Sequence, residues 1–211
     1  MLAKLSALLA AAAGSASAIG IRVTPHEQYG SSIGALGCKI DTNRVAYWPM
    51  AVDCNNICVR VSYSGRSLNL LRIDQSGGAY DISYDAWNTL VSGQSATVHP
   101  VTGGSVAMDY DTVPADQCAS LLHTGALPLS AANSMNFLFS CLAQPSSWVA
   151  NHYQLYNIAN ADCTFGYDEQ CTLPAGQNQA TCPHQLGANP PLVGDTVYNV
   201  QYGTGALIPA P

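Results

Sequence analysis

The segment Arg72–Ser83, with the sequence RIDQSGGAYDIS, carries an aspartate where acid–base chemistry is possible. It leads from an apolar, strand-like stretch through Gly77-Gly78 to Asp81, and a helix is expected to begin at Ser83. A carboxylate at the end of a strand can donate or accept a proton in catalysis. It can equally hold a loop together by accepting hydrogen bonds from backbone N–H groups. Both interpretations stand on the residues alone, and we favour the structural one.

The other residues that could do chemistry form no recognisable catalytic or metal-binding pattern. The histidines stand singly along the chain, at His26, His99, His123, His152 and His184. No serine lies in a G-x-S-x-G motif, and no glycine-rich phosphate loop follows a strand and opens a helix. Cys54-x3-Cys58 and Cys182-Pro183-His184 contain zinc-ligand residue types, but an oxidising compartment favours disulfides over thiolates. We therefore expect neither a metal nor a cofactor.

The first eighteen residues have the pattern of a secretory signal peptide. Lys4 supplies a positive start, Leu5–Ala13 an apolar core, and Ala16-Ser17-Ala18 a small-residue cleavage site. No later apolar run approaches the roughly 20 residues of a membrane-spanning helix. The sequence therefore predicts an exported, extracellular protein.

The eight cysteines of an exported chain predict four disulfides. Four lie before residue 119 and four beyond it, so we expect each set to pair internally, with the partners within each set left open. The cysteines are Cys38, Cys54, Cys58, Cys118, Cys141, Cys163, Cys171 and Cys182.

The charge of the chain argues against nucleic acids and anionic membranes as partners. Removal of Lys4 with the signal peptide leaves six basic and thirteen acidic residues, a net charge of −7. The basic residues are dispersed, whereas nucleic acids and anionic membranes need clustered positive charge. The chain is rich in Tyr, Asn, Ser and Gly, which offer rings, hydroxyls and amides. We expect a monomer that binds a polysaccharide or an extracellular host protein.

Periodicity predicts mainly short strands with a few helices. Apolar and polar residues alternate in the segments 59–63, 68–73, 105–110 and 197–202. Ser64-Gly65 is a turn signal between the first two of these. Ser83 is a candidate N-cap of a short helix that Ser92-Gly93 ends, with Trp87 on its buried side. Further short helices are predicted at 131–142 and 148–156, and a disulfide-stapled loop region at 162–191.

The segment from Cys38 to Cys118 resembles the barwin and expansin (RlpA-like) group. The resemblance rests on Cys54–Val61 (CNNICVRV), Arg72–Gln75 (RIDQ), Gly77-Gly78 and Tyr80–Ser83 (YDIS) in this order. It implies a mainly β protein, a six-stranded double-psi β-barrel with one or two short helices. The chain then divides into a signal peptide (1–18), an N-terminal segment (19–37), the barrel (38–118) and a cysteine-rich C-terminal extension (119–211) with short helices and a final strand.

The resemblance also supplies candidate catalytic residues. Asp81 resembles the general acid of related barrel endoglucanases. The segment Arg44–Pro49 (RVAYWP) is similar to the aromatic first strand of those enzymes, which carries their catalytic base. The carboxylates near that stretch are Asp41 and Asp53. Glycoside hydrolysis needs two carboxyls, about 5–5.5 Å apart for retention or about 6.5–9.5 Å apart for inversion. If the protein were an enzyme, Asp81 would act with Asp41 or Asp53.

Departures from the group favour a binding role. Ser76 stands where barwin-type sequences carry a cysteine, so their disulfide pattern does not transfer. Asp41 and Asp53 lie in no matching motif, so we expect a secreted, non-catalytic protein; a polysaccharide hydrolase or a protease inhibitor is the alternative. The chain is also similar to small secreted proteins of filamentous fungi, including elicitors that plants detect. The candidate binding residues are Tyr47, Trp48, Tyr80 and Asp81.

Overall fold

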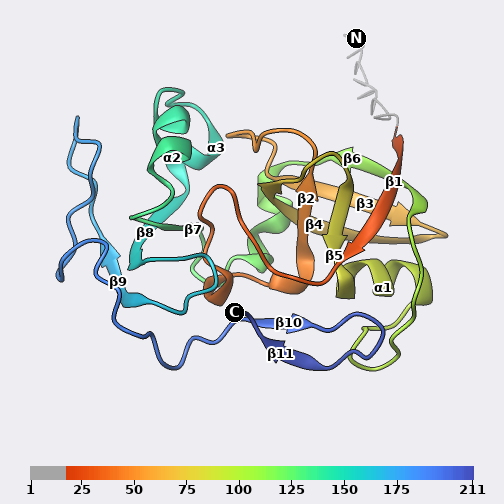
Figure 1. Cartoon of the computed structure of the whole chain (residues 1–211). Helices are drawn as coiled ribbons and strands as arrows, with labels where there is room; N and C mark the ends of the chain where they lie inside the picture. The colour runs from red at the N-terminus through yellow and green to blue at the C-terminus, as the bar shows by residue number, and fades with distance from the viewer. Residues whose placement is uncertain (1–17) are drawn as a thin grey trace, which may run out of the picture.

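The computed structural model describes residues 18–211 (Figure 1). The predicted signal peptide, apart from Ala18, lies outside the described residues. Within residues 18–211, no helix is both long and apolar enough to cross a membrane.

Six strands close into a barrel in the order β1-β5-β2-β4-β3-β6. The pairs β1–β5 and β2–β4 are parallel, and the other four pairs are antiparallel. The mainly β fold with a six-stranded double-psi barrel is therefore confirmed. The barrel strands are β1 (Ile19–His26), β2 (Val45–Trp48), β3 (Cys58–Tyr63), β4 (Arg66–Gln75), β5 (Tyr80–Ser83) and β6 (Val106–Thr112).

The predicted start of the barrel at residue 38 is wrong, because β1 precedes it. Ile19–Val23 pairs with β6, and Val23–His26 pairs with β5, so this segment closes the barrel. Only Val23 of β1 is fully buried, and Pro25 has no backbone N–H to donate to a neighbouring strand. A strand with one buried residue gives little alternation from which to predict it.

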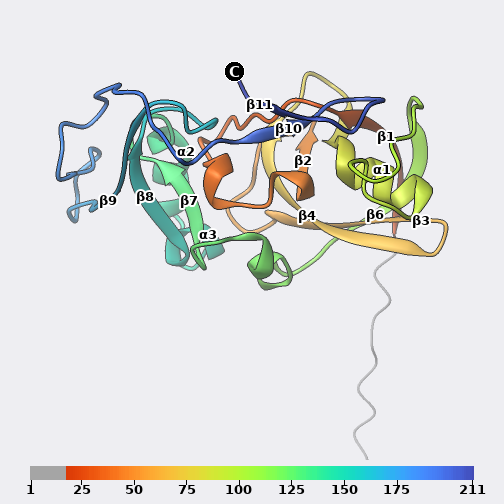
Figure 2. The same cartoon turned by 90° about the horizontal axis from the view of Figure 1, so that it is seen from below.

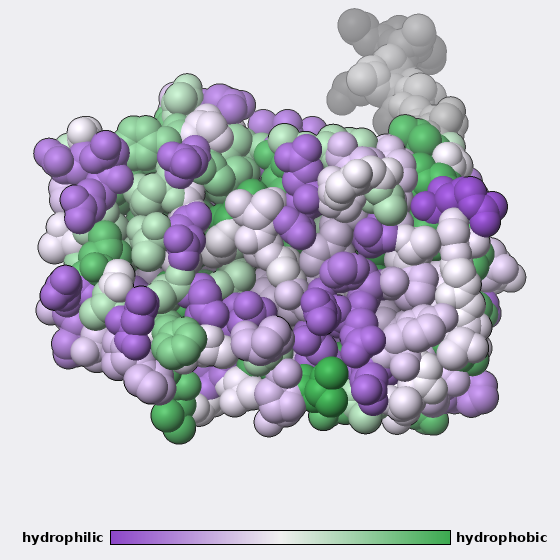
Figure 3. All heavy atoms as spheres, in the orientation of Figure 1, coloured by the Kyte–Doolittle hydropathy of each residue, from purple (hydrophilic) through white to green (hydrophobic). Residues whose placement is uncertain are grey.

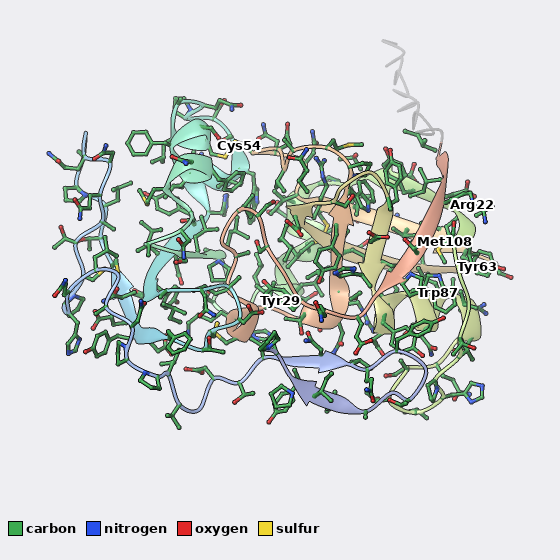
Figure 4. All side chains as sticks on the ribbon, in the orientation of Figure 1. Arg22, Tyr29, Cys54, Tyr63, Trp87 and Met108 are labelled. Carbon is green, nitrogen blue, oxygen red and sulfur yellow. A yellow bond between two sulfur atoms is a disulfide. The ribbon has the colours of Figure 1, made fainter. Side chains whose placement is uncertain are left out.

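The hairpin of β3 and β4 and the helix that follows β5 form as predicted. Ser64 (φ 49°) and Gly65 (φ 78°) both take the left-handed conformation that a two-residue hairpin turn requires. Helix α1 (Tyr84–Ser92) ends at Gly93, which has φ 85°. Trp87 of α1 is 1% exposed and packs beneath the barrel, as expected (Figure 4). Ser83 is the N-cap residue of α1, as predicted, but its hydroxyl makes no capping hydrogen bond.

The second half of the chain contains a three-stranded sheet that was not predicted. Its order is β7-β8-β9, with β7 and β8 parallel. Of the helix predicted at 148–156, only Trp148–Asn151 (α3) is helical, and the residues from Tyr153 belong to the strand β8. The loop predicted at 162–191 contains the strand β9 (Gly166–Cys171). The elements are η3 (Ala115–Leu121), β7 (Leu127–Ser130), α2 (Met135–Leu142), α3 (Trp148–Asn151), β8 (Tyr153–Ile158), β9 (Gly166–Cys171) and the hairpin β10 (Tyr198–Val200) and β11 (Leu207–Pro209).

The second half packs against the outer face of the barrel. Val45 and Tyr47 of β2 and Leu71 of β4 join one buried cluster with Leu127 and Leu129 of β7. All four residues of β2 are buried, since its other face lies in the barrel interior. Figure 2 shows the β7–β9 sheet beside the barrel, with the β10–β11 hairpin lying along the barrel.

Two of the four disulfides join the barrel region to the second half, so the predicted pairing within each set is wrong. Since β2 and β4 pack against that half, cysteines on the two sides meet; Figure 4 shows Cys54 beside α2. Chain-entropy estimates give each long closed loop about 4–5 kcal/mol of stabilisation. The bridges are Cys38–Cys163, Cys54–Cys141, Cys58–Cys118 and Cys171–Cys182.

Limited reduction should open Cys171–Cys182 first. Both of its cysteines are half-buried, whereas each other bridge has at least one buried cysteine. Access of a thiolate controls the rate of exchange. Under limiting reductant with an alkylating agent, peptide mapping should find label on Cys171 and Cys182 while the circular dichroism spectrum is unchanged. Earlier labelling of Cys54 or Cys58 would contradict this order.

Candidate functional site

The four candidate binding residues lie on two different faces of the barrel wall. Side chains alternate between faces along a strand, so neighbours in the sequence diverge. Trp48 and Tyr80 belong to the cluster inside the barrel, whereas Tyr47 belongs to the cluster outside it. Asp81 pairs in register with Tyr47 and shares its outer face. The predicted single site is therefore two separate groups of residues.

The barrel has two ends, and they are closed in different ways. At one end, α1 covers the opening, and Arg66 at the start of β4 donates hydrogen bonds to the carbonyls of Leu90 (2.7 Å) and Val91 (2.9 Å) of α1. At the other end, β1 and β5 begin and β2 and β4 finish. One side chain from each of four strands closes this second end, and we call these four residues the aromatic end. They are Trp48, Arg72, Tyr80 and Tyr110.

The rings of the aromatic end hold one another in place. Trp48 meets Tyr80 edge-on with centroids 5.3 Å apart and meets Tyr110 in the same way at 4.5 Å. The centroids of Tyr80 and Tyr110 are 6.2 Å apart. Edge-to-face pairs at these distances are favourable. Trp48 is 1% exposed and forms the floor, so its predicted role as a surface contact is wrong; Tyr80 and Tyr110 are half-buried.

Arg72 is the charged member of the aromatic end. Its guanidinium carbon lies 5.8 Å from the centre of the Trp48 ring. Its Nη2 donates to the carbonyls of Met50 (3.2 Å) and Ala51. Burial lowers the pKa of Arg72 from its ordinary value, and the charge of Asp53 acts against this shift. Because a guanidinium is not deprotonated in proteins, Arg72 is a cation beside the rings.

The outer group brings Asp81 together with β1 rather than with backbone N–H groups. The Thr24 hydroxyl donates a hydrogen bond to Asp81 Oδ1. Burial raises the pKa of Asp81, while the charge of His26 lowers it. The His26 ring lies 4.7 Å from that of Tyr47. Our expectation that Asp81 binds backbone amides is corrected: its hydrogen bond is to a side chain.

Tyr47 was predicted to contact a ligand, but it is 3% exposed and has no free ring face to present. Burial and the nearby charge of Asp74 raise the pKa of its phenol far above the ordinary value. The residue packs the outer wall of the barrel.

Three further aspartates accept hydrogen bonds from backbone amides. Asp41 accepts from the Asn43 amide (3.0 Å). Asp53 accepts from the amides of Asn55 and Asn56, both at 2.7 Å. Asp74, at the end of β4, accepts from the Ser32 (2.7 Å) and Gln75 (2.9 Å) amides. The two proposed partners of Asp81 in hydrolysis are thus engaged in turns.

Sequence reasoning missed Tyr110, Arg72, Thr24 and His26 as members of these groups. Tyr110 carried a usable signal, because it shares a face with Val106 and Met108 in an alternating segment. The others depend on strand pairings that join distant parts of the chain. Within residues 18–211, no group of three or more His, Cys, Asp or Glu side chains is arranged to hold a metal ion.

Asp81→Asn should gain stability relative to the unmutated protein as pH rises. Folding raises the pKa of Asp81, so its ionisation above the unfolded value weakens the folded state, and asparagine removes this loss. Thermal midpoints at pH 3 and pH 7 measure the effect. The difference between variant and unmutated protein should be more favourable at pH 7.

Asp109→Asn, on an exposed position of β6, is the control and should show no such trend. An Asp81→Asn variant that loses more stability at pH 7 than at pH 3 would contradict the assignment.

No protein-family model matches the chain, and no curated protein matches it. Solved structures that resemble it include the solution structure of the fungal elicitor Cerato-Platanin, at 17% identity and TM-score 0.36, over 48% of this chain and 98% of that one. Cerato-platanin 3 from M. perniciosa matches at 12% identity and TM-score 0.35, over 47% and 98%. Cerato-platanin 2 from M. perniciosa matches at 15% and 0.35, over 47% and 98%. A likeness at this level assigns neither a family nor a function to the chain.

Proposed function

We propose that the protein is an exported, non-catalytic protein that binds polysaccharide at an extracellular surface through the aromatic end of its barrel. The observation that carries this proposal is the pair of half-buried rings, Tyr80 and Tyr110, held edge-on by Trp48. Rings fixed by packing lose little conformational entropy when a ligand stacks on them. Sugar rings have apolar faces bordered by hydroxyls, which match a tyrosine face and its hydroxyl.

The polar atoms at this end suit a sugar better than an apolar ligand. The rings of Tyr80 and Tyr110 lie with their centroids 6.2 Å apart, and each carries a phenol hydroxyl, a group that can both donate and accept a hydrogen bond. The segment after β2, from which Met50 and Ala51 bind Arg72, borders the rings. A ligand there meets rings, hydroxyls and a cation together.

Binding without bond cleavage follows from how the carboxylates are used. The usual hydrolysis of a glycoside requires an acid and a second carboxyl across the scissile bond. Asp81 points to the outer face, away from the rings, and Asp41 and Asp53 accept bonds within their own turns. The aromatic end itself contributes no carboxylate.

Tyr80→Ala should weaken binding to the polysaccharide by about fivefold, since one stacked ring contributes on the order of 1 kcal/mol. Pull-down isotherms on cellulose, chitin and β-1,3-glucan, and calorimetric titration with soluble pectin, measure this. Tyr198→Ala, which removes a 47% exposed tyrosine from β10, is the matched control and should bind normally.

Unmutated protein should release no reducing ends from any of the four polymers. If no polymer is bound, or if Tyr198→Ala weakens binding as much as Tyr80→Ala, the proposal fails. Release of reducing ends would establish a hydrolase instead.

A second candidate is binding of an extracellular protein through the loop that Cys171–Cys182 closes. A groove of about 450 Å³ lies between this loop and α2, lined by Phe139, Leu142, Tyr153, Leu173 and Pro174 among others. Figure 3 shows hydrophobic residues gathered over the part of the surface that carries α2. Phe139 is 40% exposed.

Inhibition of a panel of extracellular proteases tests this candidate. Phe139→Ser should abolish inhibition, and Tyr80→Ala should leave it unchanged. Absence of inhibition across the panel removes the inhibitor function.

A further inference from the structure

We propose that the polysaccharide bound at the aromatic end carries carboxylates, as uronic acid residues do, and that Arg72 binds one of them. This inference rests on the proposed function and names the class of its ligand. Its three supports are the burial of Arg72, the donors left free at this end, and the arrangement of charge and rings.

Arg72 is a nearly buried cation without a carboxylate partner. It is 6% exposed. The ion pairs found within residues 18–211 are Lys39–Asp168, Arg44–Asp85 and His184–Glu169, and none includes Arg72. Buried charges in proteins are almost always paired, because removal from water is costly. Asp53 acts on Arg72 only through its field and is itself bound to two backbone amides.

Two buried N–H donors at the aromatic end also have no acceptor among the described residues. They are Nε of Arg72 and Nε1 of Trp48. Arg72 Nη2 is satisfied by two carbonyls, and only part of the five-donor capacity of the guanidinium is used. Both atoms lie below the surface, so a bound acceptor would reach the guanidinium of Arg72 through its remaining N–H groups rather than through these two. A carboxylate brings two oxygens and matches the fork of a guanidinium.

The surroundings of Arg72 favour a sugar acid over a densely charged anion. The half-buried rings of Tyr80 and Tyr110 are suited to pyranose faces, and a single arginine supplies one positive charge beside them. A polymer with spaced carboxylates fits one cation and two rings.

A matched pair of ligands tests the inference directly. Oligogalacturonate and the same oligomer with its carboxyls methyl-esterified have the same stereochemistry and differ in charge. Titration calorimetry at low salt should give an affinity at least about tenfold higher for the acid form, because a charge-assisted bond is replaced by a neutral one. The preference should shrink as salt is raised.

Arg72→Gln should remove the preference between the two oligomers. Arg22→Gln is the control, since Arg22 lies on the exposed side of β1 and binds Ser105. If Arg72→Gln does not fold, as judged by circular dichroism, the comparison of acid and ester on the unmutated protein decides alone.

Equal or tighter binding of the ester overturns the inference but leaves polysaccharide binding intact. Failure to bind either oligomer or any of the four polymers overturns the proposed function as well. A preference that persists in Arg72→Gln assigns the carboxylate to another residue and also overturns the inference.

Discussion

The packing of the second half of the chain against the outer face of β2 and β4 is the constraint on which the rest of the structure depends. Val45, Leu71 and Ile73 lie in one apolar cluster with Leu127 and Leu129. Burial of apolar surface is the main favourable term in folding, and here it removes one wall of the barrel from water. The barrel is therefore one part of a larger core. Its end opposite α1 remains as the place where interior rings reach the surface.

Strand alternation then decides what the remaining residues can do. Tyr47 and Trp48 are neighbours in the sequence, as are Tyr80 and Asp81, yet each pair is divided between two environments. The carboxylate joins Thr24 and His26 on the outside, and the rings join Arg72 at the barrel end. This separation of acid from aromatic surface is the physical reason that the arrangement fits binding better than hydrolysis.

Features that depend on residues close together in the sequence could be predicted. The turn at Ser64-Gly65, the end of α1 at Gly93 and the burial of Trp87 are of this kind. The sequence predicts helix over 148–156, but residues 153–156 belong to the strand β8, which parallel pairing with the distant β7 stabilises. The place of β1 in the barrel and the partners of Arg72 rest on contacts that no local pattern encodes.

The two disulfides that cross between the halves have a consequence for how the chain becomes a finished molecule. Cys38 and Cys163 are 125 residues apart, and Cys54 and Cys141 are 87 apart. Cys58 meets Cys118 much earlier along the chain, 60 residues on. During synthesis Cys38 and Cys54 must therefore stay reduced, or exchange out of temporary pairings, until the second sheet has emerged. The order in which the native bridges become possible therefore differs from the order in which their first cysteines are made, so any pairing formed early has to be exchanged before the native set is complete.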